Sequence, residues 1–326
     1  MSNATLAVPP APPQAPAKKW GDQAFKLITL LASLSIIVLI VALGYILYDS
    51  SKLSINKFGF GFITGTNWDS VAGIFGALPY IYGTLSSSLI GLLIAVPLSV
   101  ATAAYLTDLA PVWLRQPVVS IIEMLAAVPS VIWGLWAILV MVPFLRDYIY
   151  PTMQKVLEPI PLIGQLFSGP IYGVGILSSG IILAVMIIPI ITSVSREILR
   201  SVPNIQREAA YALGATRWEV TRIAVLSYAK RGLLGASVLG LGRALGETMA
   251  VTMVIGNKSD ISASLFAPGY SLASVIANEF GDATTPMHQS ALAELALVLL
   301  GVTLTVNIAA MLLVKTFTTK ETRRVA

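Results

Sequence analysis

Six long apolar segments constrain this chain more strongly than any other feature of its sequence. Each holds about 20 residues, enough for a helix to cross roughly 30 Å of hydrocarbon. Their approximate bounds are 27–48, 84–106, 118–145, 176–194, 233–255 and 291–314. A helix satisfies its own backbone hydrogen bonds, which a bilayer demands of any spanning segment. The segments therefore predict an all-α, polytopic membrane protein with about six transmembrane helices.

The composition agrees with a membrane protein and leaves little room for catalysis. Of the 326 residues, 56% are hydrophobic and 11% are charged, whereas soluble domains carry about 25% charged residues. The chain has no cysteine and one histidine, so it can form no disulfide or thiolate metal site. We find no nucleophile–base or metal-ligand constellation. We therefore expect no catalytic residues, no metal site and no enzyme activity.

The apolar segments divide the chain into a membrane domain and two polar ends. Residues 1–22 are rich in proline, which lacks an amide donor and favours extended chain, and they predict a disordered cytoplasmic tail. The apolar run begins only after this tail and is too long for a signal peptide. We assign 23–315 to the six-helix membrane domain, with a polar connection at 196–231, and 316–326 to a C-terminal cytoplasmic tail.

The distribution of lysine and arginine predicts the orientation of the chain. Cations gather in three stretches, which are residues 18–26, the connection at 196–231 and the C-terminal tail. With six spans these stretches fall on one side of the membrane, and an excess of cations marks the cytoplasmic side. The connections on the other side balance their cations with acidic residues. We therefore expect the N- and C-termini to be cytoplasmic.

The polar connection contains a segment at 207–227, REAAYALGATRWEVTRIAVLS, that is too polar to span and too regular for a plain linker. Ala210, Leu213 and Ala224 can share one apolar face. Gly214 interrupts the pattern and predicts a sharp turn between two short helices. Such a helix can dock into a groove of a partner protein or rest on lipid headgroups, and the pattern alone leaves both open.

Arg243 and Glu247 are charged residues near the middle of the fifth apolar segment. A charge at that depth costs roughly 2.5–3.5 kcal/mol on insertion scales and usually faces a bundle interior or a water-filled path. Their spacing places both on one helical face, and Gly242 and Gly246 allow a neighbour or substrate to approach closely. Because an arginine fork matches phosphate or carboxylate oxygens, we interpret the pair as an anion site in a substrate path.

Two roles are open for Glu247. It can hold Arg243 when the site is empty, or it can accept a hydrogen bond from a protonated ligand such as hydrogen phosphate. The structural alternative is a buried Arg–Glu pair that fixes helix packing, although buried ion pairs are weak evidence of net stability.

The segment at 207–227 resembles the cytoplasmic loop of ATP-binding-cassette importer permeases. That loop carries Glu-Ala-Ala, then a glycine four residues after the last alanine. In the family it forms the coupling helix that docks into the ATPase subunit. The resemblance therefore implies an ATPase contact formed by the matching residues, which are Glu208, Ala209, Ala210 and Gly214.

The second half of this loop follows the family less closely. The family has Ile-x-Leu-Pro there, and Leu226 matches the leucine. Ala224 and Ser227 stand where the isoleucine and the proline are usual. The departures concern the exit from the loop rather than the part that docks.

The run GRALGETMAV in the fifth segment, together with this loop, resembles the permeases of phosphate-specific ABC importers, of the PstC type. The resemblance extends from about residue 20 to the C-terminus. It implies the type I ABC importer permease fold and phosphate passage across a bacterial inner (plasma) membrane, with Arg243 and Glu247 in the path. As partners it implies a homologous second permease subunit, an ATP-binding-cassette ATPase dimer and a periplasmic or lipid-anchored phosphate-binding protein. Membrane lipid is a further partner, and we expect no contact with nucleic acid.

The chain contains no Gly-x-x-x-x-Gly-Lys-Ser/Thr loop, so we expect a separate partner chain to use ATP and this chain to bind no cofactor. Two alternatives stay open. One is a permease for another oxyanion, such as sulfate or molybdate. The other is an ion-coupled secondary anion transporter, which predicts internal repeats around a midplane site, and we see no clear repeat.

Trp68 and the single histidine, His288, lie in the predicted external connections. An external tryptophan suits an anchor at the membrane interface better than a cofactor role. A lone histidine in such a connection suits a solvated position. We therefore expect Trp68 at the interface and His288 in water.

Overall fold

The computed structural model describes the backbone of residues 19–325 and the side chains of residues 20–315. Most of the tail predicted at residues 1–22 lies outside these described residues. Its last part differs from the prediction, because helix α1 already begins at Lys19. The chain divides into two units, Met1–Ile46 and Leu47–Ala326. The first unit holds the N-terminal part of α1, and the second holds the end of α1 and all the later elements.

The described residues form helices joined by loops, with two isolated β-bridges and no longer strand. The α-helices are α1 (Lys19–Phe58), α2 (Gly61–Thr64), α3 (Leu78–Ala104), α4 (Val112–Ala126), α5 (Ser130–Trp136), α6 (Val142–Phe144), α7 (Tyr150–Leu157), α8 (Ile176–Arg200), α9 (Asn204–Ala212), α10 (Arg217–Glu219), α11 (Leu226–Leu245), α12 (Met249–Val254), α13 (Leu272–Glu279) and α14 (Pro286–Val325). The π-helical segments are η1 (Tyr105–Leu109), η2 (Ala137–Met141), η3 (Leu145–Ile149) and η5 (Val220–Val225), and η4 (Gly164–Phe167) is a 3₁₀ turn.

Five helices of the described chain are long and apolar enough to cross a membrane. They are Trp20–Phe58, Leu78–Leu109, Ser130–Leu157, Ile176–Arg200 and Pro286–Lys315. Each overlaps a segment predicted from the sequence, so the all-α, polytopic class is confirmed. The fifth predicted segment, 233–255, is different, because it is divided between α11 and α12.

The third predicted segment, 118–145, is also divided. Helix α4 ends at Ala126, and a new helix begins at Ser130 and continues to Leu157. Pro129 lies at the break with φ −58° and ψ 140°. A proline has no amide hydrogen to donate and disfavours helical conformation in the residue before it. The apolar pattern runs through this point unchanged, so the predicted bounds of this helix were wrong at both ends.

Small side chains bring α3 and α8 into close contact. Along α3, Gly91 lies so near α8 that an added Cβ would be 3.2 Å from the carbonyl oxygen of Gly180. The Ser99 hydroxyl donates a hydrogen bond to the carbonyl oxygen of Ile188, 3.2 Å away. Small residues and interhelical hydroxyl bonds are the usual means of joining helices in lipid, where burial of apolar surface provides little force. This pair forms the centre of the bundle.

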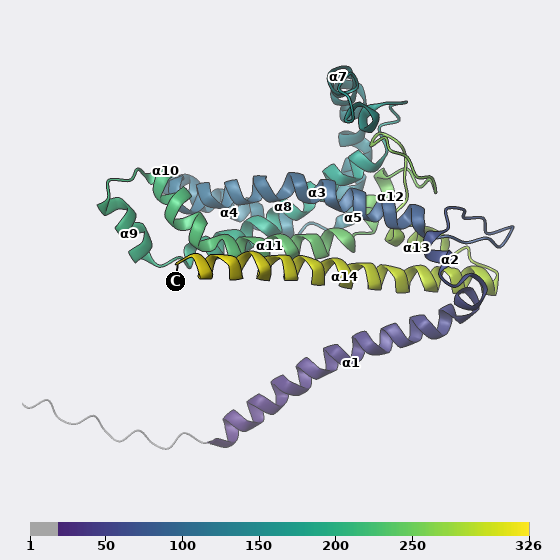
Figure 1. The fold of residues 1–326 in the computed structure, drawn as a ribbon, viewed down its shortest axis with the longest axis horizontal. Helices are drawn as coiled ribbons and strands as arrows, with labels where there is room; N and C mark the ends of the chain where they lie inside the picture. The colour runs from purple at the N-terminus through teal and green to yellow at the C-terminus, as the bar shows by residue number, and fades with distance from the viewer. Residues whose placement is uncertain (1–18, 326) are drawn as a thin grey trace, which may run out of the picture. The chain divides into compact units, whose positions relative to one another are not determined.

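The connections gather at the two ends of the bundle (Figure 1). Helices α9 and α10 lie at one end, and α12 and α13 lie toward the other. The C-terminal end of α14 lies at the same end as α9. The polar connection and the C-terminal end of α14 therefore lie at the same end of the bundle, and the side of the membrane that this end faces stays a prediction.

His288 is buried, contrary to the sequence prediction, and Trp68 is partly buried in contact with it. The connection after α1 folds against the start of α14, which leaves His288 only 7% exposed. The Trp68 Nε1–H donates to Oε2 of Glu279 at 2.9 Å, and His288 Nε2 lies 3.0 Å from the same oxygen. Phe75 stacks on the His288 ring with centroids 5.5 Å apart. These long-range contacts are the reason that His288 is not solvated and that Trp68 is only partly exposed.

Candidate functional site

Arg243 lies in the last turn of α11, immediately before the helix breaks. Helix α11 ends at Leu245, and Gly246 caps it with φ −93° and ψ 0°. The backbone becomes helical again only at Met249, where α12 begins. Glycine is among the least favourable residues within a helix. The pair Gly242 and Gly246 therefore makes this part of the apolar segment a place where the helix can end.

Arg243 and Glu247 both line an open groove of ≈ 810 Å³. Most of its lining comes from α11 and the break that follows it. Helix α8 contributes Ile190, and α14 contributes Asn307 and Met311. The groove is therefore formed by three helices, and the charged end of α11 lies within it.

The two charged side chains are not paired with each other. Among the described residues, Arg243 forms no hydrogen bond or ion pair, and its side chain is exposed. The Glu247 Oε1 instead accepts a hydrogen bond from the backbone N–H of Ala250, 3.4 Å away. Of the two roles left open for Glu247, a direct hold on Arg243 is therefore not seen in this conformation. The physical reason is the helix break, which ends the regular spacing that would place the two side chains together.

Asn307 is an uncharged polar residue of the groove that the sequence analysis did not identify. A Cβ added to Gly242 would lie 3.6 Å from its Oδ1 and 3.7 Å from its Nδ2. The amide can both donate and accept hydrogen bonds. The available signal was a polar amide in the otherwise apolar segment at 291–314, since polar residues inside membrane helices usually face a bundle interior.

The second candidate region is the loop that contains α9 and α10. Gly214 has φ +84°, a left-handed conformation that glycine adopts readily, and it separates the two helices. The predicted turn at Gly214 is therefore confirmed. The Thr216 amide and hydroxyl both donate to the Glu219 carboxylate at 2.8 Å. These bonds lower the pKa of Glu219, with the backbone bond the larger cause.

The residues expected to meet an ATPase do not all face outward. Glu208, Ala209 and Gly214 are exposed. Ala210 is half-buried and packs with Ala224 against the apolar cluster at this end of the bundle.

The predicted apolar face of this loop is only partly correct. Leu213 does not join Ala210 and Ala224 but is 90% exposed. Ile205 and Trp218 are also exposed, at 68% and 54%. Several exposed apolar residues in one short loop suit a protein contact or a membrane contact.

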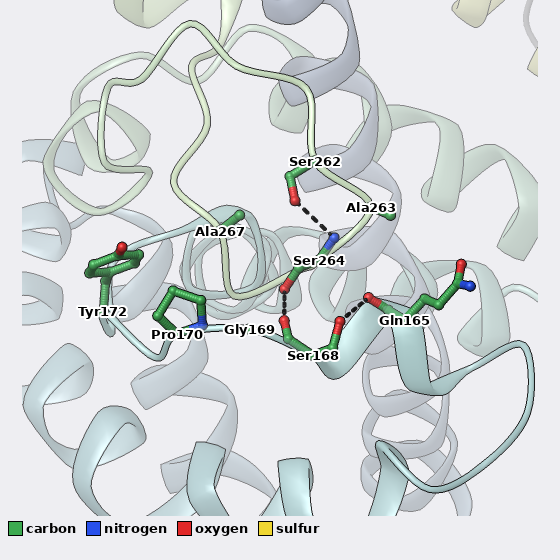
Figure 2. A pocket seen from close by; sticks show the side chains of 9 residues that line it. All are labelled: Gln165, Ser168, Gly169, Pro170, Tyr172, Ser262, Ala263, Ser264 and Ala267. Carbon is green, nitrogen blue, oxygen red and sulfur yellow. Dashed lines mark hydrogen bonds between the residues drawn. The ribbon is translucent and has the colours of Figure 1, made fainter.

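A further cavity, of ≈ 400 Å³, lies between two loops at the other end of the bundle (Figure 2). Figure 2 shows one hydrogen bond that joins the two walls, of 2.6 Å from the Ser264 hydroxyl to the carbonyl oxygen of Ser168. All of its lining residues are uncharged. It therefore offers hydrogen bonds but no charge to attract an anion.

The fold and the site together define a membrane transport component: a helical bundle with a charged groove at a broken helix and a structured polar loop. Residues 95–320 match the family model of the binding-protein-dependent transport system inner membrane component. The chain belongs to this family. It is therefore a multi-pass membrane protein that functions as part of a transport complex, and its relatives are transport permeases rather than enzymes.

The chain is similar over most of its length to curated permeases. It is 44% identical to the phosphate transport system permease protein PstC of Mesorhizobium japonicum, covering 86% of each chain. It is 45% identical to the protein of that name from Haemophilus influenzae, covering 90% of this chain and 93% of the relative. A probable phosphate transport system permease protein PstC of Methanocaldococcus jannaschii is 35% identical, with 87% and 90% covered.

Two solved structures share the fold. One is a bacterial ABC transporter involved in the import of alginate, with a TM-score of 0.56, 15% identity, and coverage of 92% of this chain and 99% of that chain. The other is the inward-facing MetNI methionine ABC transporter, with a TM-score of 0.50, 19% identity, and coverage of 74% and 94%. The likeness confirms the predicted type I ABC importer permease fold.

Proposed function

We propose that this chain is the permease subunit of an ATP-driven importer that moves inorganic phosphate across the bacterial inner membrane. The observation that carries the proposal is Arg243, a permanently charged side chain that faces an open groove and has no partner among the described residues. The relatives that cover most of the chain are named phosphate permeases, which supports phosphate as the anion.

The proposed role of Arg243 is to stabilise the anion during its passage. Its guanidinium presents a planar fork of donors that matches two phosphate oxygens. A charge near the middle of an apolar segment is costly, so a lasting position facing acyl chains is unfavourable. A water-filled path that receives an anion avoids this cost and accounts for the exposure of the Arg243 side chain.

Glu247 and Asn307 are proposed to distinguish anions that carry a proton from anions that do not. Hydrogen phosphate carries a hydroxyl that can donate to the Glu247 carboxylate, whereas sulfate has no such proton. The Asn307 amide can donate to an oxygen of the anion or accept from its hydroxyl. Because both residues line the groove with Arg243, one ligand could contact all three.

The loop containing α9 and α10 is proposed to be the contact with the ATPase. Glu208, Ala209 and Gly214 lie on its exposed surface, beside the exposed side chains of Leu213 and Trp218. A structured surface with apolar residues suits docking into a protein groove. In this proposal Ala210 supports the loop from inside and does not touch the ATPase.

The proposed complex also contains a homologous second permease, an ATPase dimer that uses ATP, and a periplasmic or lipid-anchored phosphate-binding protein. The second permease would close the open side of the groove that holds Arg243. The N- and C-termini would be cytoplasmic, on the side of the ATPase. Two alternative functions are a permease for a different oxyanion and an ion-coupled transporter. An uptake experiment distinguishes both from the proposed function.

The test is uptake of radiolabelled phosphate by proteoliposomes that hold the assembled complex, with and without internal ATP. We expect uptake to require ATP and the ATPase subunit. An excess of unlabelled phosphate should suppress this uptake, whereas the same concentration of sulfate should not. Uptake driven by an ion gradient without ATP would favour the secondary transporter. Suppression by sulfate or molybdate at least as strong as by phosphate would favour a different oxyanion.

A further inference from the structure

Asp108 forms a buried polar junction at the end of the bundle where the loop lies. It is part of η1, the segment that continues α3. Its Oδ1 accepts a hydrogen bond from Nη1 of Arg207, and its Oδ2 accepts one from the Thr221 hydroxyl at 3.3 Å. Both carboxylate oxygens are therefore engaged by side chains of the loop, one on α9 and one on η5.

Arg207 also reaches the end of α8. Its Nη2 donates to the carbonyl oxygen of Leu199 at 2.9 Å. One guanidinium thus joins α9 to the ends of both α3 and α8, the two helices at the centre of the bundle. This contact is made across 99 residues of sequence from Asp108, so it does not follow from local helix geometry.

The burial of this pair sets it apart from the local ion pairs in the described chain. The side chains of Arg207 and Asp108 are 19% and 11% exposed. In contrast, Arg146 and its neighbour Asp147 are 48% and 50% exposed. An exposed pair contributes little, whereas removal of one partner from a buried pair leaves an uncompensated charge and is strongly unfavourable. The Arg207–Asp108 pair is therefore a firm link, and the Arg146–Asp147 pair is a suitable comparison.

Arg207 lies directly before Glu208 on α9, and the two side chains differ in exposure. Glu208 is exposed on the outer surface of α9, where the ATPase is proposed to dock, while Arg207 points into the bundle. A displacement of α9 by a docked protein would therefore pull on α3 through Asp108. Helix α3 packs along α8, and Ile191 of α8 touches α11 closely enough that a Cβ on Gly240 would lie 2.5 Å away. Continuous packing thus connects the loop with the helix that carries Arg243.

We propose that Asp108 is a positioning residue for coupling: through Arg207 and Thr221 it makes α3 move with the ATPase-docking loop. The inference rests on the proposed function, because it requires the loop to receive the ATPase. It assigns no contact with phosphate to Asp108. Its effect is on the number of ATP molecules hydrolysed for each phosphate imported.

The experiment measures ATP hydrolysis and phosphate uptake together in proteoliposomes that contain the complete complex. We expect Asp108→Asn to raise the ratio of ATP hydrolysed to phosphate imported by roughly five-fold or more. Asp147→Asn, the same change in an exposed pair, should leave the ratio unchanged. The exchange Asp108→Arg with Arg207→Asp should restore much of the coupling that either single reversal removes, because it rebuilds the pair with opposite polarity.

A ratio that is unchanged in Asp108→Asn would overturn the inference, and so would a double exchange that is no better than the single reversals. If Asp108→Asn fails to assemble, Thr221→Val decides instead, since it removes the hydroxyl shared between Asp108 Oδ2 and the carbonyl oxygen of Arg217 and keeps the ion pair. It should raise the ratio by a smaller factor, and an unchanged ratio would again overturn the inference. Failure of the proposed function is distinguishable, because the wild-type complex would then show no ATP-dependent phosphate uptake.

Discussion

Arg243 lines the groove from the last turn of α11 and Glu247 lines it from the helix break that follows, and no ion pair joins them. Arg243 ends α11, while Glu247 binds the backbone at the start of α12. A paired arginine would have to lose its carboxylate before it could bind an anion. An arginine that is already unpaired in the described chain can receive a ligand without that cost, as a site for transient passage requires.

The first prediction concerns Arg243 itself. Arg243→Gln should abolish phosphate uptake, because the neutral amide keeps some hydrogen-bonding capacity but loses the charge that stabilises a dehydrated anion. Assembly should persist, since Arg243 supports no other described residue. Uptake of radiolabelled phosphate and co-purification of the tagged complex measure the two effects. Arg146→Gln, an identical change at an exposed position, should transport normally; normal uptake by Arg243→Gln would remove this residue from the path.

Glu247 is predicted to control selectivity. Glu247→Gln should lower phosphate uptake roughly ten-fold or more, because a hydrogen bond to a charged group is worth about 1.5–3 kcal/mol. Sulfate should become a better competitor, since the carboxylate that repels a fully deprotonated dianion has been removed. Competition assays with both anions give the ratio. Equal discrimination in the variant and the wild type would argue against a direct contact between Glu247 and the anion.

Glu208 is predicted to be needed for coupling. Glu208→Lys reverses the charge of an exposed residue on the proposed docking surface and should uncouple ATP hydrolysis from uptake. Both rates are measured in the reconstituted complex. Glu158→Lys, the same reversal on an exposed residue directly after α7 and outside this loop, serves as the control and should remain coupled. Unchanged coupling in Glu208→Lys would show that the ATPase docks elsewhere.

Gly83 is predicted to be essential for packing. An added Cβ would lie 2.2 Å from the backbone carbonyl oxygen of Tyr270, so Gly83→Ala requires a backbone shift. Overpacking of this kind costs about 1–3 kcal/mol. A fall in the temperature of unfolding in detergent would be expected. Gly301→Ala, on a helix face with no atom within 4 Å of the new Cβ, should unfold at or above the wild-type temperature. Equal temperatures for the two variants would contradict the close contact.

Glu279 is predicted to stabilise the connection that follows α1. Glu279→Ala removes the acceptor shared by Trp68 and His288 and leaves polar atoms buried without a partner, which costs about 1–3 kcal/mol. Protease cleavage within residues 59–77 should become faster. Asp282→Ala, the loss of a nearby exposed carboxylate, should leave the cleavage rate unchanged. If both variants are cleaved alike, the buried hydrogen bonds do not hold this connection.

Much of the architecture could be predicted because its causes are local. The apolar segments identify spanning helices, since a bilayer requires both apolar side chains and satisfied backbone groups. The turn at Gly214 was predicted from the sequence, because a position with left-handed backbone conformation favours glycine. Pro129 had an equally local effect, but a count of apolar residues passes over it, so the bounds of the third helix were not predicted correctly.

The sequence by itself thus determined the helical membrane class, the loop with its turn at Gly214 and the presence of charge in the fifth segment. Only the tertiary structure decided that Arg243 and Glu247 are separated, that Asn307 lies beside them, that His288 is buried and that Arg207 binds Asp108. The physical reason is the range of the interactions. Helix formation and hydropathy depend on neighbouring residues, whereas these contacts join helices far apart in the chain, and no local pattern records which side chains will meet.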